Sequence, residues 1–150
     1  MYPCLVLLAL QVSGADSLSP VWHRDYGRAL RQAEAVGKPM AVFIGRGGLG
    51  PECLSEEGEL GPEVSRLLAA FYVCLYIDAV QPGARELVEA FEAGAAPTLV
   101  LSDASRIYQA FRHSGTLDNA GLYRVLQQHR VQEEVAAAPQ EESPAPPCRT

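Results

Sequence analysis

Apolar residues change repeatedly between two spacings along residues 22–130, and a glycine or proline marks most of the changes. Apolar positions three and four residues apart are typical of the buried face of a helix, whereas an unbroken apolar run is typical of a buried strand. The helical spacing predicts helices over residues 26–36, 62–71, 84–91 and 122–126. The apolar runs predict strands over residues 40–44, 72–77, 98–101 and 106–111.

The order of these elements determines what kind of sheet is expected. Strands separated by helices should run parallel to one another through right-handed crossovers. The last two strands are joined by residues 102–105 alone, so they should form an antiparallel hairpin. The sequence therefore predicts an α/β domain with a mixed sheet of about four strands, helices on both faces and one helix before the first strand.

The first fifteen residues do not fit this pattern. They carry no charge, and residues 4–10 form an apolar run that is followed by the small residues Gly14 and Ala15. Such a run is too short to span a membrane and is typical of an export signal, although no basic residue precedes it. We expect cleavage near Gly14 and Ala15 and a periplasmic or extracellular protein. A buried amino-terminal strand and a retained anchor are the alternatives.

Residues 131–150 also fall outside the domain. They include four prolines and four glutamates but only one arginine, and they lack the apolar residues that a packed core needs. We predict a disordered acidic tail, with a binding role or covalent chemistry at Cys148 as the alternative. No other stretch of the chain has the length and hydrophobicity of a membrane span.

Composition and charge exclude some classes of partner. The chain is 48% hydrophobic and 20% charged, which is typical of a globular protein. Its formal net charge of −6 gives no electrostatic reason to expect nucleic-acid binding. His23, His113 and His129 are far apart and lack a second ligand at metal-binding spacing, so no metal site is expected.

Three segments together resemble the thioredoxin superfamily, in particular exported bacterial thioredoxin-like domains. They are residues 37–44, the strand from Phe71 to Asp78, and residues 94–100 with the sequence Gly-Ala-Ala-Pro-Thr-Leu-Val. The last is similar to the loop that holds the cis-proline of the family. The resemblance implies that this loop faces the reactive site and offers backbone groups to an extended peptide. We therefore predict a cis Ala96–Pro97 bond, the alternative being a trans proline that begins a strand.

The dithiol of the family is missing from the position that the resemblance gives it. Thioredoxin chemistry needs two cysteines separated by two residues at the start of a helix, which stabilises the attacking thiolate. Between Gly45 and Leu54 the only cysteine is Cys53. If Gly50 and Cys53 occupy the two thiol positions, the attacking thiol is lost, and in a shifted register both are lost.

These observations predict a non-catalytic module that binds a protein or an extended peptide. The expected binding surface consists of Gly48, Gly50, Pro51, Ala96, Pro97 and Thr98. The alternative is an enzyme that exchanges thiols and disulfides through Cys53 as its catalytic residue. Five glutamates between residues 52 and 63 argue against a thiolate there and otherwise indicate a solvated face. No cofactor is expected.

Two other features of the sequence indicate different chemistry. Residues 45–50 satisfy the G-x-G-x-x-G pattern of dinucleotide-binding loops, and Asp78 ends the next strand as a ribose-binding acid would. However, Gly58, Gly61 and Pro62 interrupt the helix that should follow, so dinucleotide binding is not favoured. Cys74 lies inside a predicted strand, where a thiol normally packs, and a bridge from Cys53 to Cys148 is conceivable.

Overall fold

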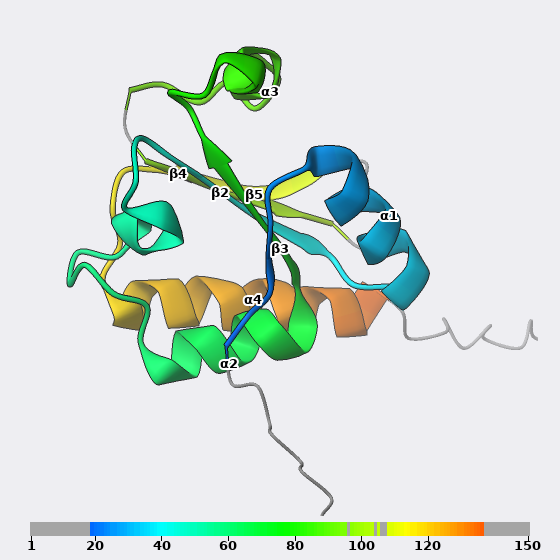
Figure 1. Ribbon diagram of the computed structural model, residues 1–150. Coiled ribbons are helices and arrows are strands. Elements are labelled where there is room, and N and C mark those ends of the chain that lie inside the picture. Colours follow the sequence, from blue (N-terminus) through cyan, green and yellow to red (C-terminus); the bar gives the residue numbers. More distant parts are fainter. Residues whose placement is uncertain (1–18, 96, 104, 106–107, 137–150) are drawn as a thin grey trace, which may run out of the picture.

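The computed structural model describes residues 19–95, 97–103, 105 and 108–136. Five strands form one sheet in the order β1-β3-β2-β4-β5 (Figure 1). They are β1 (Trp22–His23), β2 (Met40–Gly45), β3 (Val73–Asp78), β4 (Thr98–Ser102) and β5 (Gln109–Ser114). β3 pairs in parallel with β1 and β2, β4 pairs antiparallel with β2, and β5 pairs antiparallel with β4.

Helices cover both faces of this sheet, as expected (Figure 1). They are α1 (Tyr26–Val36), α2 (Pro62–Phe71), α3 (Arg85–Ala90) and α4 (Asn119–Ala136), with short 3₁₀ helices η1 (Gly50–Leu54) and η2 (Pro82–Ala84). The Asp25 side chain caps the first turn of α1, and Gly37 ends the helix in the left-handed conformation with φ 67°. Pro62 begins α2, where a missing N–H does no harm.

The core lies on both sides of the two central strands. Every residue of β2 is buried, which confirms that this strand lies inside the sheet. Phe43, Tyr76 and Leu99 pack on the side of α2 and α4, whereas Ile44 and Leu75 pack on the side of α1 and α3. The alternation of side chains along each strand thus supplies two separate hydrophobic clusters. Cys74 is buried in the first of them, as expected for a packed thiol.

Three details of the predicted sheet were wrong. There are five strands, because Trp22 and His23 add a two-residue edge strand that precedes α1 and is too short to leave a pattern. β5 continues to Ser114 instead of ending at Phe111. β5 is the outer strand of the sheet, so much of it is exposed and can be polar. The polar residues after Phe111 therefore did not mark the end of the strand.

The third error is the direction of β4, which runs antiparallel to β2 although a helix precedes it. α3 has only six residues and lies beyond the end of β3, so it does not carry the chain back along the sheet (Figure 1). The chain therefore re-enters the sheet at the end where β3 leaves it. A parallel crossover needs a connection that returns the whole length of the strand.

The predicted signal segment and the predicted tail beyond Ala136 lie outside the described residues. Within the described part of the chain, no helix combines the length and hydrophobicity needed to cross a membrane.

Candidate functional site

The ends of three neighbouring strands bring the predicted site segments together at one edge of the sheet. Gly45 at the end of β2 pairs with Asp78 at the end of β3, and Ile44 pairs with Thr98 at the start of β4. The glycine-rich loop (residues 46–49) and then η1 follow Gly45, and Pro97 directly precedes Thr98. The two segments that the sequence placed in one site therefore lie side by side at this edge (Figure 1).

The sulfur of Cys53 lies against the backbone of Gly45. A Cβ atom added to residue 45 would come within 2.4 Å of Cys53 Sγ and within 2.9 Å of Tyr76 Oη. Only glycine fits at position 45 without displacing these side chains, so η1 can pack directly on the end of β2. Cys53 packs against the hydrophobic cluster on the side of α2 and α4, which also contains Leu99 of β4.

The surroundings of Cys53 do not favour a thiolate. Burial raises the pKa of the Cys53 thiol, while a hydrogen bond with the Tyr76 side chain opposes this in part. The Tyr76 hydroxyl donates a hydrogen bond to the Gly47 carbonyl oxygen over 3.3 Å. Burial, followed by the charges of Cys53 and Asp78, raises the pKa of Tyr76 to about 12. Both groups are therefore neutral near pH 7.

Asp78 holds the glycine-rich loop in place. Its Oδ1 accepts a hydrogen bond from the Gly47 N–H at 3.0 Å and another from the Val80 N–H at 3.1 Å. These backbone donors hold the pKa of Asp78 below its usual value. The carboxylate that the dinucleotide pattern would assign to a ribose thus fastens the loop to the end of β3. Nearby, the guanidinium of Arg24 lies over the Tyr76 ring, 5.6 Å from its centroid.

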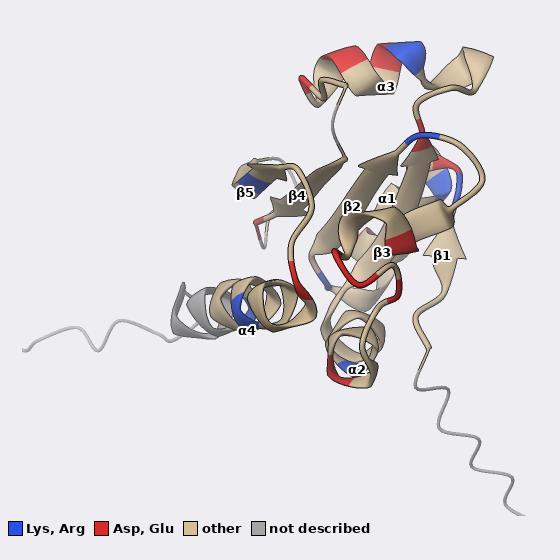
Figure 2. Cartoon of the chain, turned by 90° about the vertical axis from the view of Figure 1, so that its left-hand side faces the viewer, with Lys and Arg blue, Asp and Glu red and all other residues tan. Residues whose placement is uncertain are grey.

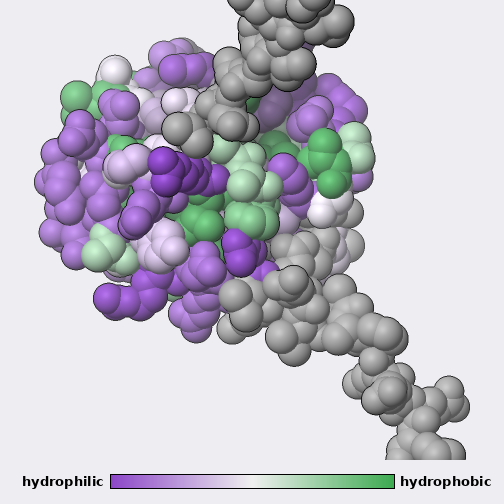
Figure 3. Space-filling view, turned by 90° about the horizontal axis from the view of Figure 1, so that it is seen from below, coloured by the Kyte–Doolittle hydropathy of each residue, from purple (hydrophilic) through white to green (hydrophobic). Residues whose placement is uncertain are grey.

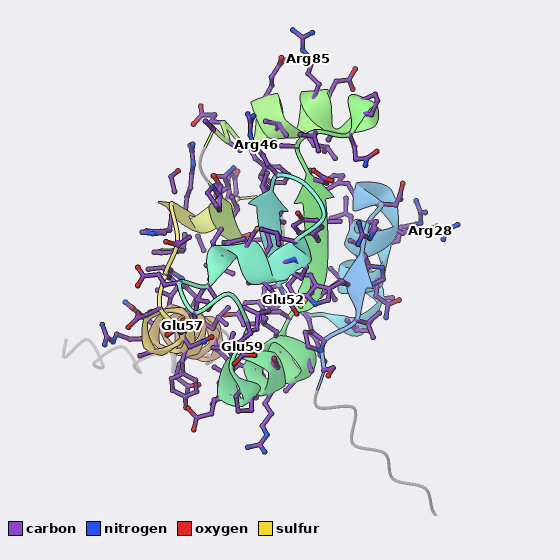
Figure 4. The ribbon with its side chains drawn as sticks, turned by 60° about the vertical axis from the view of Figure 1, so that its left-hand side comes forward. Arg28, Arg46, Glu52, Glu57, Glu59 and Arg85 are labelled. Carbon is purple, nitrogen blue, oxygen red and sulfur yellow. The ribbon has the colours of Figure 1, made fainter. Side chains whose placement is uncertain are left out.

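The local backbone also differs from what a reactive dithiol needs. Gly50 adopts φ 67°, a conformation that disfavours any residue with a side chain. Cys53 is the fourth residue of η1, a 3₁₀ helix of five residues, so no long helix directs its dipole at the sulfur. Cys53 and Cys74 are both free thiols. Figure 4 shows Arg46 at the end of β2 and Glu52 on η1.

The expected binding surface differs in exposure from residue to residue. Gly48 is exposed, Gly50, Pro51 and Pro97 are half-buried, and Ala96 lies outside the described residues together with the isomer of its bond to Pro97. Thr98 is completely buried, so its side chain does not contribute to a surface. The Pro97 carbonyl accepts a hydrogen bond from the Gly115 N–H at 2.7 Å.

Two exposed apolar residues of this edge escaped the sequence analysis. Leu49 in the glycine-rich loop is 72% exposed, and Val80 in the loop after β3 is 58% exposed. Val80 reaches the edge because its N–H binds the same Asp78 carboxylate as Gly47. A single apolar residue in a loop leaves no periodic pattern, so only the coordinates reveal these two as neighbours of the site.

The acidic segment after η1 is exposed to solvent, as its charge indicated, and it is also attached to α4. Glu57 accepts hydrogen bonds from the backbone N–H and the side-chain amide of Asn119, and from the Ser55 hydroxyl at 2.8 Å. The Ser55 and Asn119 bonds lower the pKa of Glu57. Figures 2 and 4 show this acidic loop between η1 and α2, with Glu57 beside the start of α4. The loop therefore fixes the position of η1 relative to α4.

Among the described residues there is no group of three potential metal ligands. His129 packs against Phe111 with ring centroids 5.0 Å apart, which is a structural contact and not part of the edge described above.

Similar folds occur among solved structures of thioredoxins. A thioredoxin from Thermus thermophilus matches 83% of this chain and 98% of its own, with 24% identity and a TM-score of 0.65. The oxidoreductase DsbH matches 75% of this chain and 86% of its own, with 19% identity and a TM-score of 0.59. An uncharacterised thioredoxin-like protein from Clostridium perfringens matches 84% of this chain and 94% of its own, with 17% identity and a TM-score of 0.56.

This chain has the thioredoxin fold. Neither the protein-family models nor the curated proteins give a match to its sequence. At these identities the likeness concerns the fold alone, and the chemistry of the site depends on Cys53 and its neighbours.

Proposed function

We propose that this protein is an exported thioredoxin-like domain that lacks dithiol chemistry and binds a protein or an extended peptide at the edge formed by the glycine-rich loop, η1 and Pro97. The observation that carries the proposal is Cys53, a single half-buried thiol with a raised pKa in a site that is otherwise assembled. The strands keep the arrangement of the thioredoxin fold, but Gly50 stands where the resemblance would place the attacking cysteine of a dithiol.

The exposed side chains at this edge support a binding role. Leu49 and Val80 present apolar surface next to backbone of the glycine-rich loop, which offers hydrogen-bonding groups without side chains in the way. An extended chain can use such backbone groups for affinity and apolar contacts for specificity. Export is supported by the uncharged apolar segment 4–10 alone, and the mass of the secreted chain, with a new amino terminus near Ala15, would test it.

Binding can be measured with fluorescently labelled extended peptides that contain no cysteine, so that no disulfide contributes. We expect anisotropy titrations to select peptides with apolar side chains, and Leu49→Ser to weaken binding about fivefold or more, about 1 kcal/mol of binding free energy. Val36→Ser is the matched control, because Val36 is 45% exposed but lies at the far end of α1. Equal binding by both variants would place the peptide elsewhere.

Monothiol exchange is the second candidate, favoured by the side-chain hydrogen bond between Tyr76 and Cys53, which lowers the pKa of the thiol. In this reaction the Cys53 thiolate attacks the glutathione sulfur of a mixed disulfide and releases the substrate thiolate. A glutathione thiolate then attacks the Cys53 mixed disulfide, which restores Cys53 and releases glutathione disulfide.

Activity assays distinguish the two candidates. The protein should show no insulin-disulfide reduction and no glutathione exchange above that of the Cys53→Ser variant. Cys74→Ala serves as the control for losing a thiol that is buried away from the edge. Exchange activity that disappears in Cys53→Ser and persists in Cys74→Ala would establish the enzyme in place of the binding module.

A further inference from the structure

An apolar groove lies between α2 and α4, on the face of the molecule that is farthest from α3 (Figure 1). Its volume is about 900 Å³, and Pro62, Val64, Ala120, Tyr123 and Gln127 contribute to its lining. Both helices contribute their amino-terminal halves, because Gly61 lies beside Asn119. Figure 3 views this face from below and shows apolar residues gathered near its middle between hydrophilic ones. The groove is separate from the edge that carries Cys53.

Two features of the groove indicate an extended occupant. Tyr123 is an aromatic residue of the lining and is 38% exposed. The side-chain oxygen of Gln127 is buried and has no hydrogen-bond partner among the described residues. A buried acceptor without a donor is unfavourable, and a backbone N–H of a bound chain would satisfy it once the Gln127 side chain turns towards the groove.

The carboxyl-terminal segment of the same chain has the length to reach the groove. α4 ends at Ala136, thirteen residues after Tyr123, which corresponds to about 20 Å along a helix. Fourteen further residues follow Ala136. In the polyproline conformation, at about 3.1 Å per residue, six or seven of them return over that distance. The residues that arrive at the groove are then those from about 143 onward.

Those residues have the chemistry that such a groove accepts. Pro144, Pro146 and Pro147 favour the polyproline conformation, which docks on aromatic side chains with little loss of entropy. Ala145 and Cys148 keep a backbone N–H that can donate to Gln127. Glu141 and Glu142 come just before the prolines, and the groove carries Arg124 at its margin.

We propose that the carboxyl-terminal segment folds back along α4 and places residues 144–147 in the groove between α2 and α4, with its glutamates facing Arg124. A second copy of the chain would compete for the same surface. The covalent connection gives the segment an effective concentration in the millimolar range, which a second copy does not reach at ordinary protein concentrations.

Paramagnetic relaxation tests this proposal on the full chain. A nitroxide label is attached to Cys148 in the variant Cys4→Ser/Cys53→Ser, where Cys74 is protected by burial. We expect the amides of residues 63, 64 and 123–128 to lose more than about half of their signal intensity relative to the reduced label, and those of α1 to keep theirs. The loss should persist when the labelled chain is diluted into an excess of unlabelled, natural-abundance protein.

Substitutions in the groove provide the second arm of the test. Tyr123→Ala and Arg124→Glu should each restore most of the lost intensity, whereas Tyr108→Ala and Arg85→Glu should not, because Tyr108 and Arg85 are exposed away from the groove. Unchanged amides in the labelled parent chain would overturn the proposal. The proposal would also be overturned if signal loss appeared only in a mixture of spin-labelled chains and separate isotope-enriched chains. That outcome would assign the groove to a second copy of the protein.

Discussion

The sulfur of Cys53 occupies the space that a Cβ atom on Gly45 would need, with 2.4 Å between the two positions. This contact joins the last residue of β2 to η1 and brings the only cysteine of the predicted motif against the sheet. It also explains why the thiol is half-buried. The Tyr76 hydroxyl completes the contact, since it would lie 2.9 Å from the same Cβ.

Gly45→Ala should therefore displace η1 and destabilise the domain. Added volume at a packed position costs about 1–3 kcal/mol, because neither β2 nor the Tyr76 ring can move far. Urea denaturation measures the loss of unfolding free energy, and Gly48→Ala is the control because a Cβ there meets no atom within 4 Å. In Gly45→Ala/Cys53→Gly part of the loss should be recovered. Equal unfolding free energies of Gly45→Ala and Gly48→Ala would contradict the close contact between Gly45 and Cys53.

The pH profile of Cys53 alkylation should show a raised pKa. The folded protein buries the thiol, so the rate with iodoacetamide should still increase with pH above 9.0, the ordinary value. Tyr76→Phe removes a hydrogen bond that lowers the pKa, so it should shift the profile to still higher pH. Mass spectrometry distinguishes Cys53 from Cys74. A profile that levels off below pH 8 would indicate an activated thiol and favour the exchange enzyme.

The elements with strong local signals could be predicted from the sequence. α1 and α2 have the expected bounds because Asp25, Gly37 and Pro62 mark their ends chemically. β2 could be predicted because an unbroken run of apolar residues is typical of a strand that is buried on both faces of a sheet. β1 could not be predicted, because two residues are too few to leave a pattern. The direction of β4 could not be predicted either, because it depends on where α3 lies relative to the sheet and not on a local pattern.

The site could be predicted only in part. The absence of a second sulfur near Cys53 is visible in the sequence itself. The roles of Tyr76 and Asp78 are not, because both lie on β3 and reach the glycine-rich loop only after β2 and β3 have paired. The acidity of Glu57 correctly indicated solvent exposure, but it did not indicate that the carboxylate also binds the start of α4 across 62 residues of sequence. Such pairings are tertiary and leave no spacing to recognise.

His129 should make the stability of the domain depend on pH in the mildly acidic range. Burial lowers its pKa below the ordinary 6.5, so the unfolded chain binds a proton more readily than the folded one. Its contribution to stability is complete above pH 6.5 and is lost as the pH falls from there through the folded pKa. Urea midpoints at pH 7.5 and 5.5 should differ more for the wild type than for His129→Phe, which keeps the ring contact with Phe111. Equal differences in the two proteins would contradict this role.

Restoring the missing cysteine should not restore an efficient catalyst. Gly50→Cys places two cysteines two residues apart, yet position 50 has φ 67°, where a side chain costs about 1–2 kcal/mol. The partner Cys53 remains half-buried, with a raised pKa, in a five-residue 3₁₀ helix. We expect Gly50→Cys to unfold at lower urea concentration than the wild type and to reduce insulin no faster than Gly48→Cys. Rapid reduction by Gly50→Cys alone would mean that the backbone can rearrange into the reactive form, and that the loss of a single sulfur accounts for the inactivity proposed for this chain.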